Sequence, residues 1–192
     1  SFFYKLFEKF FPKTLKPRDQ LMQALEEAEK NLVIDPYSRS VIEGALQVES
    51  LKVRDVMVPR SKMIMISSEA TTKNLLQIMV ASSHSRFPIH NEEQDSILGV
   101  VLAKDLLAHL AQNQDDEFNY REYLRDALSV PESKPLGALL REFQQNKSHM
   151  AIVLDEYGEI AGLVTLEDVI EQIVGEIEDE HDKEEDNIID YG

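Results

Sequence analysis

The chain has 192 residues, of which 36 are acidic and 20 basic, and its formal net charge is -16. This acidic excess argues against a nucleic-acid-binding protein, because such proteins neutralise phosphates with Lys and Arg. The sequence contains no cysteine, which excludes disulfides, thiol catalysis and cysteine-ligated zinc. Apolar residues make up 43% of the chain, which is typical of a globular protein.

The first part of the chain, residues 1–50, is predicted to be a helical segment. Its opening stretch SFFYKLFEKFF is typical of a helix in a membrane interface or against a partner, or of aromatic side chains that fasten the N-terminus to the folded body. Asp19 is expected to cap one helix, and Asp35 followed by Pro36 is expected to begin a second. No apolar run approaches the roughly 18 to 20 residues of a spanning helix, and no signal peptide is evident, so we expect a cytoplasmic chain.

From Val53 onward, short aliphatic runs alternate with helical periods, first over residues 51–115 and again over 116–178. The first copy contains the runs MIMI, RFPIH and SILGVV, and the second contains HMAIVL and IAGLV. This pattern predicts an α/β fold made of two β-α-β-β-α repeats that pack as one unit. A shift of 63 aligns the two copies without a gap over Ser85/Ser148, Ile89/Ile152, Ile97/Ile160, Gly99/Gly162, Val101/Val164 and Asp105/Asp168, and a shift of 71 aligns Arg54-Asp55 with Arg125-Asp126.

Each copy ends with a glycine-containing strand and a helix whose first turn carries an aspartate. In the second copy Thr165 stands three residues before Asp168, which is the spacing of a structural capping box. The same residues also suit a nucleotide, because a helix N-terminus and a hydroxyl bind phosphate while a carboxylate accepts ribose hydroxyls. Gly162 would let a ligand approach the backbone closely, and the run HMAIV would form an apolar wall for a base. Both interpretations remain open from the sequence.

The repeated corner resembles the tandem CBS motifs, in which Gly-x-x-Thr/Ser-x-x-Asp binds the ribose and phosphate of adenosine nucleotides. Gly162, Thr165 and Asp168 match this pattern, whereas Leu102 replaces the hydroxyl residue between Gly99 and Asp105. More narrowly, the chain is similar to the CorC family of magnesium and cobalt efflux proteins over about residues 35 to 182. The motifs that carry this similarity are RDVMVPRSKM (54–63), HSRFPI (84–89), HMAIVLDEYG (149–158) and GLVTLEDVIEQIVGEIEDE (162–180).

The resemblance implies a tandem CBS pair that binds AMP or ATP, forms a homodimer and continues beyond an acidic linker at 179–192 into a C-terminal domain. It places Thr165 near phosphate and Asp168 on ribose. Two arginines are expected to hold the phosphate tail because guanidinium groups match phosphate geometry, although either could instead form a surface salt bridge. The site residues predicted in this way are Thr165, Asp168, Met150, Ala151 and Ile152 around the second copy, Val58, Phe87 and Asp105 around the first, and Arg60 and Arg86 for the phosphates.

We find no catalytic constellation in the sequence, which lacks a GxSxG elbow, an HExxH pair and a P-loop. A nucleotide hydrolase is therefore the weakest hypothesis, and we predict that the chain is not an enzyme. The acidic run 175–186 is interpreted as a solvated linker, although its carboxylates suit a hard cation such as Mg²⁺.

The favoured hypothesis is a regulatory module of an ion-homeostasis protein that senses AMP or ATP, with Mg²⁺ as a further candidate ligand. A membrane transporter is a candidate partner, with the chain at the inner face of the membrane, and nucleic acid is not expected as a partner. The alternative is a structural dimerisation and docking module without a nucleotide.

Overall fold

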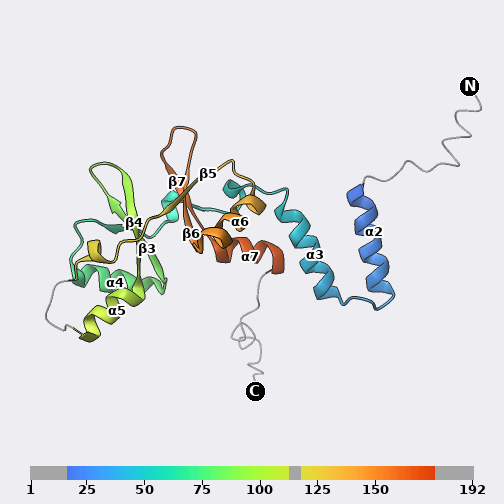
Figure 1. The fold of residues 1–192 in the computed structure, drawn as a ribbon, viewed down its shortest axis with the longest axis horizontal. Helices are drawn as coiled ribbons and strands as arrows, with labels where there is room; N and C mark the ends of the chain where they lie inside the picture. Colours follow the sequence, from blue (N-terminus) through green and yellow to red (C-terminus); the bar gives the residue numbers. More distant parts are fainter. Residues whose placement is uncertain (1–16, 113–117, 176–192) are drawn as a thin grey trace, which may run out of the picture. The chain divides into compact units, whose positions relative to one another are not determined.

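The computed structural model describes residues 17–112 and 118–175 of the chain (Figure 1). The aromatic stretch predicted to form a helix or to fasten the N-terminus lies outside these residues, as does the acidic run from Glu176 onward. No helix within the described ranges is long and apolar enough to cross a membrane.

The chain divides into two compact units. The first unit comprises the chain up to Gln47 together with the residues from Glu171 onward, and the second unit runs from Val48 to Ile170.

The first unit begins with helices α2 (Pro17–Lys30) and α3 (Pro36–Val48). The predicted start of α3 is confirmed, because Asp35 Oδ1 accepts the backbone N–H of Ser38 at 2.6 Å. That bond holds the pKa of Asp35 below its usual value. The prediction that Asp19 caps α2 is wrong, since the helix already begins at Pro17 and Asp19 lies in its first turn. A proline at the first helical position, with its fixed φ, accounts for the earlier start.

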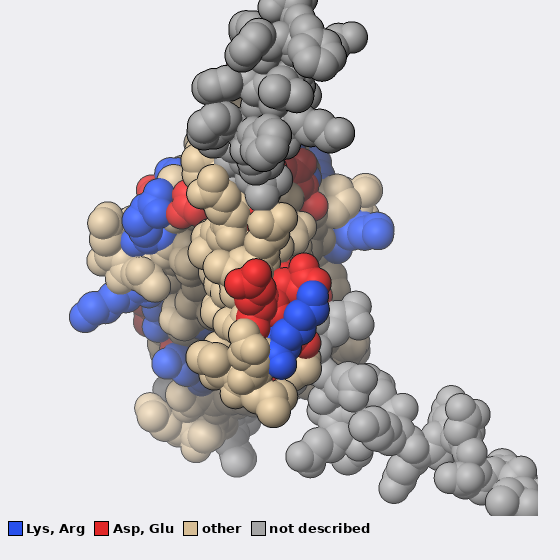
Figure 2. All heavy atoms as spheres, turned by 90° about the vertical axis from the view of Figure 1, so that its right-hand side faces the viewer, with Lys and Arg blue, Asp and Glu red and all other residues tan. Residues whose placement is uncertain are grey.

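Helices α2 and α3 are joined by Arg39, whose guanidinium bonds Glu29 at 2.6 Å and Glu43 at 2.7 Å. These two carboxylates raise the pKa of Arg39. On the surface viewed in Figure 2, acidic and basic side chains lie side by side. Helix α3 also closely approaches the end of α7 (Leu166–Val174) within this unit, because a Cβ on Gly44 would lie 2.3 Å from the carbonyl oxygen of Ile173. A side chain at position 44 would therefore separate these two helices.

The second unit contains the predicted repeat, and the β-α-β-β-α order is confirmed in both copies. Helix α4 (Thr72–Ser82) begins where the Thr71 hydroxyl accepts the N–H of Asn74, and Ser83 caps its end in the left-handed conformation. The elements of the first copy are β2 (Ile66–Ser67), α4 (Thr72–Ser82), β3 (Arg86–Asn91), β4 (Ser96–Leu102) and α5 (Ala103–Gln112). Those of the second are β5 (Leu128–Pro131), α6 (Leu136–Asn146), β6 (Met150–Leu154), β7 (Ile160–Thr165) and α7 (Leu166–Val174).

The two sheets of this unit have the strand orders β2-β3-β4 and β1-β7-β6-β5. Strand β1 (Val58–Pro59) precedes the first copy in sequence but pairs antiparallel with β7 of the second copy. In the reciprocal position, Arg125 ahead of the second copy bridges Val100 of β4. We call the segments that carry these pairings, residues 53–59 and 120–125, the lead-in segments. Each lead-in segment therefore completes the sheet of the other copy.

Two glycines make this exchange possible. A Cβ on Gly162 would lie 2.3 Å from the carbonyl oxygen of Val58, and a Cβ on Gly99 would lie 2.5 Å from that of Arg125. No side chain tolerates backbone at that distance. Gly162, which we predicted would admit a ligand, thus admits the backbone of the first lead-in segment.

The register of the repeat differs from the sequence alignment. In the β-hairpins Ile89 pairs with Gly99 and Val153 pairs with Gly162, so Val153, not Ile152, corresponds to Ile89. The first hairpin is consequently one residue longer, and the ungapped shift of 63 holds only from β4 and β7 onward. The cause is that β6 is buried at four successive positions, so an alternation of exposed and buried residues does not fix its register.

The lead-in segments also align differently from the prediction. The 3-10 turns η1 (Val53–Asp55) and η3 (Tyr120–Glu122) occupy equivalent places, each just before the lead-in residue that pairs with the other copy. This correspondence is a shift of 67 and replaces the shift of 71 that was based on an Arg-Asp pair. Downstream, the run MIMI forms a strand only from Ile66, because the turn η2 (Arg60–Lys62) precedes it.

Among the described residues of the unit are two clusters of buried side chains that bear on the site. One centres on Phe87 of the first copy and takes in Tyr120 of the second lead-in segment. The other joins the two sheets, since Val100 of β4 packs with residues of β6 and β7, among them Ile152 and Leu163. The joint cluster holds the two sheets together and positions the surfaces where both copies meet.

We predict that Gly162→Ala destabilises the second unit by about 1 to 3 kcal/mol, the usual cost of overpacking. The added methyl group would push Val58 away from β7. Gly137→Ala is a matched control, because its Cβ would meet only the side chain of Glu49 and alanine is favoured over glycine in a helix. Thermal and urea unfolding of the two variants measures the difference, and equal stability of both would contradict this packing role.

Candidate functional site

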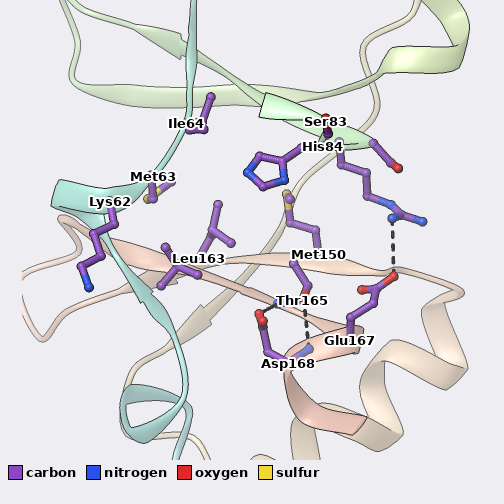
Figure 3. Close-up of a pocket in the computed structure, with 13 residues that line it drawn as sticks. Lys62, Met63, Ile64, Ser83, His84, Met150, Leu163, Thr165, Glu167 and Asp168 are labelled. Carbon is purple, nitrogen blue, oxygen red and sulfur yellow. Dashed lines mark hydrogen bonds and ion pairs between the residues drawn. The ribbon is translucent and has the colours of Figure 1, made fainter. Parts of the chain in front are cut away.

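A cavity of about 360 Å³ opens between the two copies, within the roughly 300 to 1,000 Å³ of small-molecule sites. The first copy contributes its lead-in segment, the last residue of η2 with the two that follow, and the segment from the end of α4 to the start of β3. The second copy contributes β6, β7 and the first turn of α7 (Figure 3). The lining residues are Val58, Lys62, Met63, Ile64, Ser83, His84, Ser85, Arg86, Met150, Leu163, Thr165, Glu167 and Asp168.

Thr165 and Asp168 meet at the floor of the cavity and form a complete capping box. The Thr165 N–H donates to Asp168 Oδ2 at 2.7 Å, and the Asp168 N–H donates to the Thr165 hydroxyl oxygen at 3.2 Å. This reciprocal pair explains why α7 begins at Leu166. The structural interpretation of the motif is therefore realised.

The capping box leaves both side chains able to bind a ligand. The Thr165 hydroxyl oxygen only accepts in this box, so its O–H can still donate. An ionised carboxylate can accept about four hydrogen bonds, and the box takes one of them from Asp168. The corner can thus cap its helix and contact a phosphorylated ligand at once.

One wall of the cavity is apolar and the opposite side is charged. Val58, Met63 and Leu163 supply aliphatic surface, which suits a flat hydrophobic group. Across the opening, Arg86 Nη1 lies 3.7 Å from Glu167 Oε1 (Figure 3). An anionic group between Thr165 and Arg86 would meet a hydroxyl donor, a helix N-terminus and a guanidinium.

The equivalent corner of the first copy is arranged differently. Asp105, the counterpart of Asp168, is ion-paired with the guanidinium of Arg125, and this pairing raises the pKa of Arg125. Leu102 stands where the second copy has Thr165. The predicted first site therefore has neither the hydroxyl nor an unengaged carboxylate.

Arg60, predicted to hold phosphates, is not among the lining residues and forms a surface salt bridge instead. Its Nη1 and Nη2 donate to Asp95 at 2.8 and 2.5 Å. His90 Nε2 lies 2.9 Å from the same carboxylate. Arg60 and His90 hold the pKa of Asp95 well below its usual value. The salt-bridge alternative that the sequence left open is thus the observed one for Arg60.

Three further predicted residues lie in the core and not on the cavity wall. Ala151 and Phe87 have no exposed surface and Ile152 is 2% exposed. Of the predicted set, the structure brings together Thr165, Asp168, Met150, Val58 and Arg86.

The prediction missed several lining residues. Lys62 and Met63 end the first quoted motif and His84 begins the second, so the motifs already contained the signal. Leu163 and Glu167 fall within the last motif, but only the folded arrangement turns them toward the cavity (Figure 3).

The CBS domain family matches residues 53–112 and 121–175, which are the two copies described above together with their lead-in segments. The chain belongs to the CBS-domain family. The "Magnesium and cobalt efflux protein CorC" of Pasteurella multocida (strain Pm70) is 45% identical over 185 residues, which cover 96% of this chain and 61% of that protein. The chain thus spans about three fifths of this relative's length. The prediction of a CorC-type tandem CBS pair is confirmed.

Solved structures with nucleotides resemble this CBS pair. The CBS domain of the bacterial CNNM/CorC family Mg²⁺ transporter in complex with ATP is 42% identical, with a TM-score of 0.68, covering 74% of this chain and 100% of that chain. A CBS-domain pair with bound AMP from Klebsiella pneumoniae is 32% identical, with a TM-score of 0.56, covering 65% of this chain and 99% of that chain.

We predict that the salt bridge of Asp95 stabilises the CBS pair at neutral pH and loses its effect in acid. Because the pKa of Asp95 is lowered on folding, its contribution is complete above the usual Asp pKa of about 3.9 and declines as the pH falls below that value. Unfolding of Asp95→Asn should therefore differ from wild type at pH 7, and the difference should shrink toward pH 3. A difference that grows in acid would contradict the pairing.

Proposed function

We propose that this chain is a non-catalytic regulatory module that binds AMP or ATP in the cavity between its two CBS copies. The supporting observation is the juxtaposition of an apolar wall with the Thr165–Asp168 corner in a cavity of ligand size. Similar CBS domains occur with ATP and AMP, which supports the choice of ligand.

The chemistry of the lining suggests how the ligand is held. The adenine ring packs on Val58, Leu163 and Met150, since aliphatic and thioether groups favour a flat aromatic ring. Asp168 accepts the ribose hydroxyls. The phosphates lie at the N-terminus of α7, where Thr165 donates its hydroxyl and Arg86 supplies positive charge. Arg60, Phe87, Ala151, Ile152 and Asp105 have no role in this arrangement.

The position of the cavity accounts for regulation. Because its walls come from both copies, a bound nucleotide favours the conformation in which the copies present both walls at the right distance. A ligand shifts such an equilibrium by its differential affinity for the two states. Mg²⁺, if it takes part, is carried on the phosphates, because this ion keeps several waters and binds substrate phosphates readily.

We also propose that the module serves magnesium or cobalt efflux, as the names of its relatives suggest, at the cytoplasmic face of a membrane and with a transporter as partner. A homodimer belongs to this proposal. Its support is the exposed apolar side chains Val80 on α4 and Leu107 on α5, which are 69% and 59% exposed. Sedimentation at neutral pH should give about twice the 22.0 kDa mass of the chain, and a monomer at all concentrations would contradict the homodimer.

We predict that calorimetric titration with AMP, ADP and ATP, with and without Mg²⁺, gives saturable binding of at least one of them to the wild type. Thr165→Ala should weaken that binding about ten-fold or more, because a hydrogen bond to a charged group contributes roughly 1.5 to 3 kcal/mol. Asp168→Ala should also weaken it by removing the ribose acceptor. The absence of heat from every nucleotide would refute the proposed function.

Thr71→Ala is the matched control for Thr165→Ala. Both substitutions remove the hydroxyl that caps a helix, and each should cost about 1 kcal/mol of stability. Thr71 is not among the residues that line the cavity, so its loss should leave nucleotide affinity unchanged. The second candidate function is a docking module without a ligand. The complete capping box favours it, because capping alone would explain why Thr165 and Asp168 are present. In that case the two variants would behave alike in every assay.

A further inference from the structure

Glu167 lies inside the candidate site but takes no part in the capping box that begins α7. Its Oε1 is 3.7 Å from Arg86 Nη1 on β3 (Figure 3). It also lies 3.8 Å from Nδ1 of His149, which precedes β6. Its side chain is 62% exposed, while that of Arg86 is 28% exposed. The carboxylate is thus the more solvent-exposed partner of this pair, and the guanidinium is the more enclosed one.

The location of Glu167 conflicts with the charge of a phosphorylated ligand. A phosphate beside Thr165 at the N-terminus of α7 lies within one helical turn of this carboxylate, because Glu167 is the second residue of the helix. Like charges at such a distance repel. Phosphate and Glu167 also compete for the same guanidinium, since Arg86 faces both.

The first copy differs at this point. Lys104 holds the position in α5 that Glu167 holds in α7, because the shift of 63 applies to these helices. An acid is therefore not required for the fold of this corner. Glu167 is thus unfavourable for the expected ligand and is not needed for the fold, so its charge requires a functional explanation.

We propose that Glu167 is a positioning residue that holds Arg86 while the cavity is empty and makes the site selective against phosphate charge. The inference rests on the proposed function of this cavity. A phosphorylated nucleotide must displace the carboxylate from Arg86, after which the exposed Glu167 retains His149 as its neighbour. Adenosine, which has no phosphate, leaves the Glu167–Arg86 pair undisturbed. The charge of Glu167 therefore lowers the affinity for AMP but not the affinity for adenosine.

The test is a magnesium-free calorimetric titration of the full chain with AMP and with adenosine. Glu167→Gln keeps the size of the side chain and removes its charge. We expect this variant to bind AMP about two- to five-fold more tightly than the wild type, which corresponds to the loss of one partly exposed ion pair. Adenosine affinity should remain the same.

Glu156→Gln is the matched control for net charge. Glu156 is exposed in the turn between β6 and β7 and does not line the cavity. The substitution therefore removes one negative charge without affecting Arg86. An equal gain in AMP affinity for Glu156→Gln would indicate a general charge effect and would overturn the inference. Thermal unfolding confirms that each variant is folded.

A double-mutant cycle tests whether Glu167 acts through Arg86. In an Arg86→Met background, Glu167→Gln should raise AMP affinity less than it does in the wild type. The direct repulsion between carboxylate and phosphate is still relieved there, but no guanidinium is released. An undiminished gain in that background, an unchanged or weaker AMP affinity of Glu167→Gln alone, or a parallel change for adenosine each overturns the positioning role. If the wild type binds neither compound, the proposed function itself fails and this inference with it.

Discussion

The architecture of the CBS pair depends on the close approach of two backbones at two glycines. At Gly162 and Gly99 the chain passes so near to a carbonyl of the other copy that no Cβ would fit. These contacts hold each lead-in segment on the sheet of the opposite copy. Since Val58 belongs to one of these segments and lines the cavity, the geometry of the site follows directly from the exchange.

In the proposed function, the candidate site uses the same atoms for stability and for binding. Thr165 and Asp168 cap α7 through one acceptor position each, and the remaining hydrogen-bonding capacity faces the cavity. In the first copy the corresponding carboxylate is engaged by Arg125 and the hydroxyl is replaced by Leu102. Two halves with the same fold thus differ in chemistry, because a few side chains at equivalent positions have diverged while the backbone contacts have not.

Much of the fold could be predicted from the sequence, since the aliphatic runs and helical periods are distinct and Asp35 and Thr165 are strong capping residues. The register of the repeat could not be predicted. Strand β6 is buried on both faces, so its sequence shows no alternation of polar and apolar residues that would distinguish one aliphatic position from the next. The capping box of Thr165 and Asp168 was also predicted. The sequence could not show that Arg60 and Arg86 have different surroundings. Only in the folded chain does Arg60 pair with Asp95 while Arg86 lines the cavity.

Because the copies exchange lead-in segments, the stability of each copy depends on the other. An isolated copy would lack the partner strand that its glycine is shaped to receive, and it would expose the apolar cluster that now includes Val100 and Leu163. Local damage to one half is therefore transmitted to the other as lost strand pairing. We therefore expect the two halves to unfold together as one cooperative unit.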